Sequence, residues 1–220
     1  MRLNLGCGTK KLEGWINIDA VEACQPDVIH DITQPLPYAD LTADEVLAED
    51  LLEHFDKYAR YLVFCEWARV LKVNGKMTIQ VPNFKKIIFR YFKLGFNNFV
   101  DTTFGENLWQ SKIYNGHFGN HKWGYSEDTL EEFVLLFGIE PLKVDKIGLN
   151  LRLYGEKRRH VVLSELEETK IYSSANQCGV GEPLVAVGFA AERIKEFHAQ
   201  ENGHPRENGD PLAGFPLLRQ

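Results

Sequence analysis

Several short apolar runs of this chain end in glycine or acidic residues, and these residue types could hold a small polar ligand. Leu3–Leu5 leads into Gly6-Cys7-Gly8, and the next run, 15–18, ends at Asp19. Glycine lets the backbone approach a ligand closely, and a carboxylate at a strand end can accept both hydroxyls of a ribose. A third run is followed by Asp31, which could accept a hydrogen from the amino group of an adenine ring. A lone Asp more often forms a turn, so it is the series that predicts a nucleoside site.

Two common nucleotide-binding motifs are not matched. Lys11 stands where the dinucleotide fingerprint has its third glycine, and no Gly-Lys-Ser/Thr ending follows Gly8. The sequence therefore argues against NAD binding and against an ATP-hydrolysing loop.

The elements that would position these residues alternate between strand-like and helix-like patterns. A helix should begin near Asp56 and end at Asn74-Gly75, and another should begin at Ser126 and end at Gly138. A terminal antiparallel hairpin is expected from 140–147 and 184–191. The remaining strands are expected at 2–5, 15–18, 28–32, 45–48 and 76–81. This order predicts an α/β fold with a mainly parallel sheet.

The first two connections of this sheet are short. Six residues separate Gly8 from Trp15 and eight separate Asp19 from Val28, whereas a crossover usually takes at least about 10 to 12 residues. The first helices should therefore be reduced. We hypothesise that the sheet face they would cover is buried by an aromatic segment, by the C-terminal residues or by a second subunit, as in a homodimer.

The aromatic segment is 83–125, which holds twelve of the 26 aromatic residues of the chain. It is either an extra hydrophobic subdomain or a lid over a bound substrate. We expect one domain over 1–198 with this segment as an insert. The residues 199–220, rich in Asn, Gly, Pro and charge, are expected to be a mobile tail.

Composition narrows the choice of partner. The 220 residues carry a net charge of -6, which argues against binding bulk nucleic acid and favours a small molecule. The apolar runs are too short for a membrane span, the cysteines lack zinc-like spacing and no signal peptide is recognised, so a cytoplasmic location is expected. A run of basic and apolar residues, 85–93, predicts a half-buried helix or, alternatively, contact with a membrane surface.

Four segments, in this order, resemble motifs of class I S-adenosylmethionine-dependent methyltransferases, close to the methyltransferase type 11 group. They are Leu5-Gly6-Cys7-Gly8, Leu36-Pro37-Tyr38, Leu52-Glu53-His54-Phe55 and the stretch from Arg69 to Lys76. The resemblance covers residues 3–82. It implies a Rossmann-like methyltransferase fold, with a seven-stranded sheet and a terminal antiparallel hairpin, and S-adenosyl-L-methionine as the cofactor.

The same resemblance implies which residues contact the cofactor. Asp19 would bind the ribose, Asp31 with Ile32 the adenine, and Glu49 or Asp50 would face the methionine end. The first motif, Asn4, Gly6, Cys7 and Gly8, would line the methionine and ribose part. Asn4 replaces the acid usual in this motif and Lys10 replaces a further glycine. These departures keep a second hypothesis open, a cofactor-binding scaffold or regulatory protein without turnover.

Methyl transfer to a neutral hydroxyl is helped by a base, for which His54, His117 and His121 are the candidates. The alternative for His54 is a structural hydrogen bond. Trp123 and Tyr125, beside the second and third histidines, are expected to contact the substrate. No metal is expected, because no cysteine or carboxylate lies at ligand spacing from the His117 and His121 pair. The expected acceptor is small and polar, such as the hydroxyl of a sugar or glycan precursor.

Overall fold

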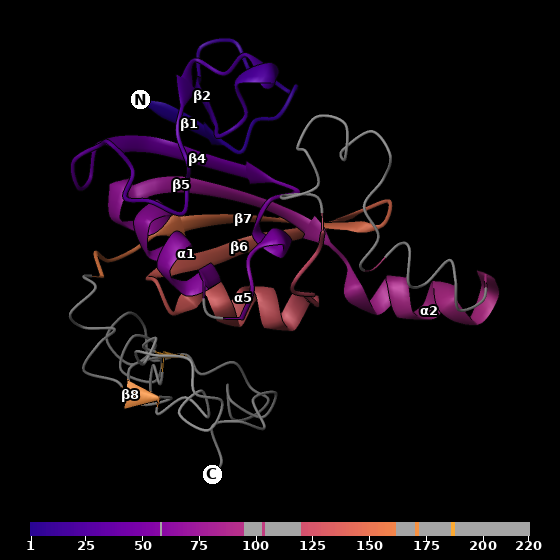
Figure 1. The fold of residues 1–220 in the computed structure, drawn as a ribbon. Coiled ribbons are helices and arrows are strands. Elements are labelled where there is room, and N and C mark those ends of the chain that lie inside the picture. Colours follow the sequence, from indigo (N-terminus) through magenta and orange to yellow (C-terminus); the bar gives the residue numbers. More distant parts are fainter. Residues whose placement is uncertain (58, 95–102, 104–119, 162–169, 172–185, 188–220) are drawn as a thin grey trace.

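The computed structural model describes residues 1–57, 59–94, 103, 120–161, 170–171 and 186–187. Seven strands in these residues form one sheet in the order β3-β2-β1-β4-β5-β7-β6 (Figure 1). They are β1 (Arg2–Leu5), β2 (Ile16–Asp19), β3 (Val28–Ile29), β4 (Ala43–Glu49), β5 (Leu71–Pro82), β6 (Ile139–Ile147) and β7 (Asn150–Lys157). The first five pair in parallel, and β7 runs antiparallel to β5 and β6. The predicted α/β class, with its terminal hairpin, is confirmed.

The second strand of that hairpin was predicted in the wrong place. β6 turns at Gly148 directly into β7, whereas the prediction placed the partner strand at 184–191. Within that range the structure describes Ala186–Val187, which forms the short β9 and pairs with β8 (Lys170–Ile171) in a separate ribbon. In β7 the buried Leu151 and Leu153 alternate with polar residues. This half-buried pattern is less conspicuous than a continuous apolar run, so the sequence pattern favours the more apolar segment 184–191 as the strand.

Within the described residues, three α-helices accompany the sheet: α1 (Ala59–Val70), α2 (Phe84–Leu94) and α5 (Glu127–Leu135). Asp56 caps the first turn of α1, because its Oδ1 accepts a hydrogen bond from the Ala59 amide at 2.9 Å. Ser126 and Thr129 form a capping box at the start of α5. α1 ends earlier than predicted, at Val70, and the chain continues directly into β5.

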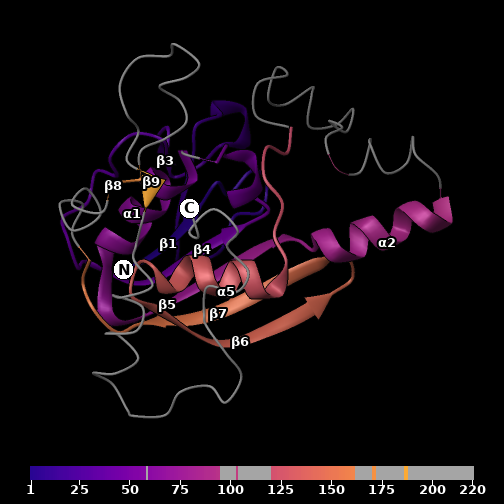
Figure 2. The same ribbon diagram turned by 90° about the horizontal axis from the view of Figure 1, so that it is seen from below.

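α1 and α5 lie on one face of the sheet, and α2 projects from the end of β5 (Figures 1 and 2). Phe64 of α1 lies 5.0 Å from Phe133 and 4.8 Å from Phe137 between ring centroids. These rings pack over an apolar sheet face that includes Leu3, Val46, Ile79 and Leu153. Such a cluster holds both helices on the sheet by burial of apolar surface.

The opposite face of the sheet is polar. Side chains in register across it include Asn4, Glu45, Glu49, Thr78, Gln80, Arg152, Tyr154 and Glu156. The link from β1 to β2 contains no helix and lies partly over this face, where Asn4 Nδ2 donates to the Lys10 carbonyl at 3.0 Å and the Leu12 amide donates to Asn17 Oδ1 at 2.8 Å.

The hypothesis that this face is buried by the aromatic segment, by the C-terminal residues or by a second subunit stays a prediction, because most of the aromatic segment and of the C-terminal residues lies outside the described residues. Charged and hydrogen-bonded side chains are stable against water, so a helix is not required there. The first connections are reduced as predicted, with a single 3₁₀ turn at Glu22–Cys24 between β2 and β3. The proposed tail, 199–220, lies outside the described residues. Across the described ranges, the longest helix is too short and too polar to cross a membrane.

Candidate functional site

A cavity of about 220 Å³ opens at the carboxyl ends of β1, β2 and β4. This is the edge at which ligands of open α/β sheets bind. Six of the predicted site residues line it: Gly6, Asp19, Asp31, Ile32, Asp50 and His54. The sheet topology, with β1 between β2 and β4, brings these residues together from segments up to 48 residues apart.

Gly6 allows the backbone to turn at the end of β1. Its φ is +58°, and a Cβ built on it would lie 2.6 Å from Leu51 Cδ1. A larger residue would clash with Leu51, and both residues line the cavity. Glycine here therefore keeps open space that a ligand could use.

Asp19 ends β2, and its side chain holds the turn that forms the cavity wall. Its two carboxylate oxygens accept hydrogen bonds from the Gly8 amide at 2.8 Å and the Val21 amide at 2.9 Å. Each oxygen keeps the capacity for a second bond, because a carboxylate offers about four lone-pair positions. Asp19 can therefore organise the loop and still accept a ligand hydroxyl.

Asp31 and Ile32 form the next part of the wall. Asp31 is exposed, and its Oδ1 accepts from the Thr33 amide at 2.9 Å and the Thr33 hydroxyl at 2.7 Å. Ile32 is buried and supplies an apolar surface. This combination of one acceptor and one apolar side chain suits the edge and face of a heteroaromatic ring.

Four other residues predicted for the cofactor do not line this cavity: Asn4, Cys7, Gly8 and Glu49. Asn4 is buried and bonds the Lys10 carbonyl and Asn17. Burial raises the pKa of Cys7 to about 12, so its side chain remains a neutral thiol. The Gly8 amide holds Asp19, and Glu49 pairs with Arg152 on the polar sheet face. Asn4 and Gly8 therefore stabilise the loops around the cavity rather than lining it.

Asp50 lines the cavity at the end of β4, with a φ of +51°. Its Oδ1 accepts from Gln80 Nε2 and from Asn150 Nδ2, each at 3.0 Å. The ammonium of the exposed Lys10 lies 3.5 Å from its Oδ2. Lys10, which replaces a glycine of the family motif, thus already neutralises the carboxylate that the resemblance places at the methionine end.

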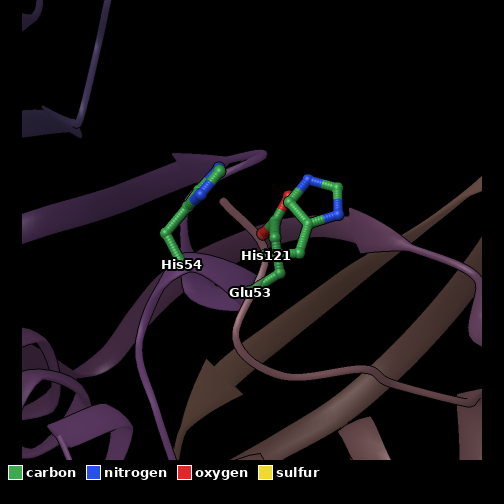
Figure 3. Close-up of side chains that lie close together, drawn as sticks. All are labelled: Glu53, His54 and His121. Carbon is green, nitrogen blue, oxygen red and sulfur yellow. The ribbon is translucent and has the colours of Figure 1, made fainter. Parts of the chain in front are cut away.

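His54 follows β4 and lies beside His121, with 5.1 Å between ring centroids. The amides of Lys122 and Trp123 donate to the Glu53 carbonyl at 2.7 and 3.0 Å, which fixes the strand-like segment 120–125 against the turn after β4. Figure 3 shows the Glu53 carboxylate between the two imidazole rings. The structure therefore brings together two predicted catalytic histidines, whereas His117 lies outside the described residues.

The three side chains of this cluster titrate abnormally. Burial, and to a lesser degree neighbouring His121, lowers the pKa of His54 to about 4. Burial also lowers the pKa of His121, and it raises the pKa of Glu53 well above its usual range. Near neutral pH both imidazoles are therefore uncharged and can accept a hydrogen bond or a proton.

A second cavity, of about 190 Å³, lies on the other side of His121. Its walls come from the end of β5 and from three parts of the aromatic segment. The lining residues are Pro82, Phe84, Ile87, Thr103, His121, Lys122, Trp123 and Gly124. The Arg60 guanidinium stacks on the Trp123 ring at 4.1 Å and holds it in place. Tyr125 is fully buried and packs against Phe133, so Trp123, and not Tyr125, lines this cavity.

Sequence reasoning missed several residues that line the first cavity. Val21 and Thr33 stand two residues after the predicted acids Asp19 and Asp31, and this proximity in sequence is the available signal. Leu51 and Lys122 carried no such signal. Leu51 is recognisable only from its close approach to Gly6. Lys122 is held at the site by the hydrogen bond that its backbone amide donates to the Glu53 carbonyl.

Comparison with known proteins gives a consistent picture. Residues 3–79 match the family described as "Methyltransferase domain". The fold is similar to that of the PH0226 protein from Pyrococcus horikoshii OT3, at 18% identity and a TM-score of 0.51 over 71% of this chain and 81% of that one. It is also similar to a SAM-dependent methyltransferase from Archaeoglobus fulgidus, at 15% identity and a TM-score of 0.50 over 71% and 85%.

A SAM-dependent methyltransferase from Thermotoga maritima shares 16% identity with a TM-score of 0.50, over 71% of this chain and 81% of that one. No curated protein matches the sequence. The methyl donor typical of the matched family is S-adenosylmethionine. The chemistry of Gly6, Asp19, Asp31 and Ile32 is compatible with this donor, because they line an open cavity with two carboxylate acceptors and one apolar side chain. Residues 3–79 therefore resemble a methyltransferase domain, and the chain shares the fold of solved S-adenosylmethionine-dependent methyltransferases.

Proposed function

We propose that this chain is an enzyme that transfers a methyl group from S-adenosylmethionine to a hydroxyl of a small polar acceptor, such as a sugar or glycan precursor. One observation carries the proposal. The cavity beside Gly6 and Asp19 and the cavity beside Trp123 are both lined by Lys122, and His54 and His121 stand at their boundary. A donor in the first cavity and an acceptor in the second would meet at these imidazoles.

The residues of the first cavity would hold and orient the donor. Asp19 accepts the ribose hydroxyls, Asp31 accepts from the adenine amino group, and Ile32 packs on the ring. The bound cofactor supplies an already activated methyl group. The main task of the chain is then alignment, because fixing the two reactants in line removes entropy from the barrier.

His121 is the better of the two bases. An ideal general base has a pKa near the working pH, and a pKa of about 4 makes His54 a weak proton acceptor. We assign His121 to take the proton of the acceptor hydroxyl and His54 to position the His121 ring. Trp123, held by Arg60, would form an apolar platform for the acceptor.

The segment 83–125 would then be the acceptor side of a single domain. Phe84 and Ile87 at its start, and His121 to Gly124 near its end, line the same cavity. This arrangement supports a substrate-covering role for the segment over that of an extra subdomain.

Calorimetry with S-adenosylmethionine and with its demethylated product tests the donor site. We expect micromolar binding, about 8 kcal/mol. Asp31→Ala should weaken it about tenfold through loss of a hydrogen bond to the ligand, and Asp19→Asn by more. Asp44→Asn, an exposed acid outside the cavity, is the matched control and should bind as the wild type does. Unchanged affinity in both cavity variants would remove these residues from the donor site.

Methyl release against pools of sugar nucleotides and polar metabolites tests turnover. His121→Asn should lower the rate at saturating donor by about 100-fold with little change in donor affinity. The Lys10–Asp50 ion pair supports the second candidate, a cofactor-binding scaffold without turnover, because it would weaken the interaction of Asp50 with the amino group of the donor and so the alignment of the methyl group. Donor binding without methyl release from any pool would select that candidate.

A further inference from the structure

We propose that Glu53, His54 and His121 form a binding site for a divalent transition-metal ion, with Zn²⁺ as the ion their ligand set matches. A nitrogen or oxygen from each of the three side chains lies within 4.8 Å of the other two. Residues 53 and 54 come from the turn after β4, and residue 121 comes from the far end of the aromatic insert. No ligand-spacing pattern in the sequence predicts this group, because Glu53 lies 68 positions before His121.

Glu53 is the observation that points to a cation. Its side chain is 1% exposed, and neither carboxylate oxygen has a hydrogen-bond partner among the described residues. A buried carboxylate without donors is unfavourable by several kcal/mol, and pairing with a cation or coordinating a metal removes that cost. In Figure 3 this carboxylate points between the two imidazoles.

The two imidazoles are oriented as metal ligands are. His54 Nδ1 lies 3.2 Å from the Asn120 carbonyl oxygen, which can only accept, so the neutral tautomer that makes this bond has its hydrogen on Nδ1 and a lone pair on Nε2. The His121 ring forms a hydrogen bond with the Thr103 backbone. A metal-bound histidine characteristically donates its other ring N–H to a carbonyl or carboxylate, which fixes the tautomer and the ring.

The donor set selects the class of metal. Two imidazoles and one carboxylate suit Zn²⁺ and similar first-row ions, whereas Mg²⁺ and Ca²⁺ prefer oxygen ligands alone. Ligand atoms around tetrahedral Zn²⁺ lie about 3.4 Å apart, given bonds of about 2.0 to 2.2 Å. The distances between the ligand atoms, up to 4.8 Å here, therefore have to shorten by up to about 1.4 Å on loading.

Three protein ligands leave one coordination position open. His54 lines the first cavity and His121 the second, so this position faces the boundary between them. An oxygen of the acceptor could occupy it, a detail that rests on the proposed function. Zn²⁺ and a proton compete for the same His121 lone pair, so metal loading and general-base action by His121 exclude one another.

The test uses the full chain, stripped of metal with a chelator, and measures binding rather than methyl transfer. Calorimetry with ZnSO₄ should show one tight equivalent, and thermal denaturation should show a Tm increase with Zn²⁺ but not with Mg²⁺. His121→Asn should weaken the tight equivalent at least 100-fold and abolish the Tm increase. His160→Gln, a histidine paired with Asp40 away from the cluster, is the matched control and should retain both.

Glu53→Gln keeps the assay informative about folding. Without metal this variant should be at least as stable as the wild type, because an amide of nearly the same shape cannot ionise in this buried position, and it should lose the Zn²⁺-dependent Tm increase. The proposal is overturned if the wild type binds no Zn²⁺, if His121→Asn binds it as the wild type does, or if metal-free Glu53→Gln is much less stable. The donor calorimetry described above is independent of these outcomes.

Discussion

At Gly6 the backbone conformation and the packing both require glycine, and the chain offers a position that separates the two effects. Gly6 and Gly148 share a φ of +58°. A Cβ at Gly6 would meet Leu51 at 2.6 Å, whereas a Cβ at Gly148 would have nothing within 4 Å. The difference between alanine variants at these positions therefore measures the close approach to Leu51.

We predict that Gly148→Ala lowers the free energy of unfolding by about 1 kcal/mol, the cost of a left-handed backbone for a residue with a Cβ. Gly6→Ala should cost at least about 2 kcal/mol, because overpacking is added to that strain. Urea denaturation of both variants gives the comparison. In a Leu51→Ala background the excess at Gly6 should disappear, and an excess that persists there would show that Leu51 is not its cause.

Residues of the site were predictable where a local pattern marks a strand end. Asp19, Asp31 and Gly6 were found in this way, and all three line the cavity. Cys7 and Glu49 stand in the same motifs but point elsewhere, because neighbours along a strand or turn face opposite sides. In the sequence, Glu53 is recognisable only as part of a motif. Its proximity to His121 depends on two backbone hydrogen bonds that no spacing rule predicts.

At the scale of elements, two acidic side chains of α5 differ in their partners. Glu127, in its first turn, pairs with Lys146 at 2.5 Å. Glu132, one turn further on, has a buried Oε2 without a hydrogen-bond partner among the described residues. Burial, followed by the charges of Asp128 and Glu131, raises the pKa of Glu132 from 4.5 to about 7. A like charge at i and i+4 on a helix adds to this effect.

Glu132 should therefore make the fold less stable as pH rises. Its pKa is higher in the folded than in the unfolded chain, so its contribution to stability is complete below pH 4.5 and is lost as pH rises through about 7. We predict that Glu132→Gln is about as stable as the wild type at pH 4. At pH 8 it should be more stable by about 1 kcal/mol, a value reduced for the partial exposure of the side chain.

Chemical denaturation at both pH values measures this difference. Glu127→Gln is the matched control on the same helix, and it should be slightly destabilising at pH 8 because it removes an ion pair and a favourable charge at the helix start. A Glu132→Gln variant that gains nothing between pH 4 and pH 8 would contradict the assignment.

Element order was largely predictable, and the exceptions have physical causes. The strands β1, β2 and β4 and the caps of α1 and α5 carry strong local signals, and the structure places them within a few residues of the prediction. β7 was missed because only one of its faces is apolar. β7 forms because β5 and β6 pair with it on both sides through backbone hydrogen bonds, and the pairing with β5 joins residues far apart in the sequence.

At the scale of the molecule, the sheet has one apolar face and one polar face. Helices α1 and α5 cover the first (Figure 2). Across the second, Arg152 pairs with Glu49 and donates to Gln80 Oε1 at 3.1 Å, and Gln80 in turn donates to Asp50 in the cavity wall. A partly buried polar network thus leads from this face of the sheet to the site.

Lys157, at the end of β7, connects this strand to the end of α1. It is fully buried, and its ammonium donates to the carbonyls of Ala68 at 2.6 Å and Leu71 at 2.7 Å, where α1 ends, and lies 3.1 Å from His160 Nδ1. Burial lowers its pKa to about 8, so it is still mainly an ammonium at pH 7. Its three donors match three acceptors, two of which are orphan carbonyls of a helix end.

We predict that Lys157→Met, which keeps the apolar stem, lowers the free energy of unfolding at pH 7 by about 2 to 3 kcal/mol, because two buried carbonyls lose charge-assisted partners. Lys143→Met removes an exposed ion pair with Asp145 on the adjacent strand and should change stability by less than about 0.5 kcal/mol. Urea denaturation followed by both circular dichroism and tryptophan fluorescence measures the two variants. Since Trp67 lies in α1 beside this contact, the two probes should report one shared transition, and equal stability of the two variants would show that Lys157 does not tie α1 to the sheet.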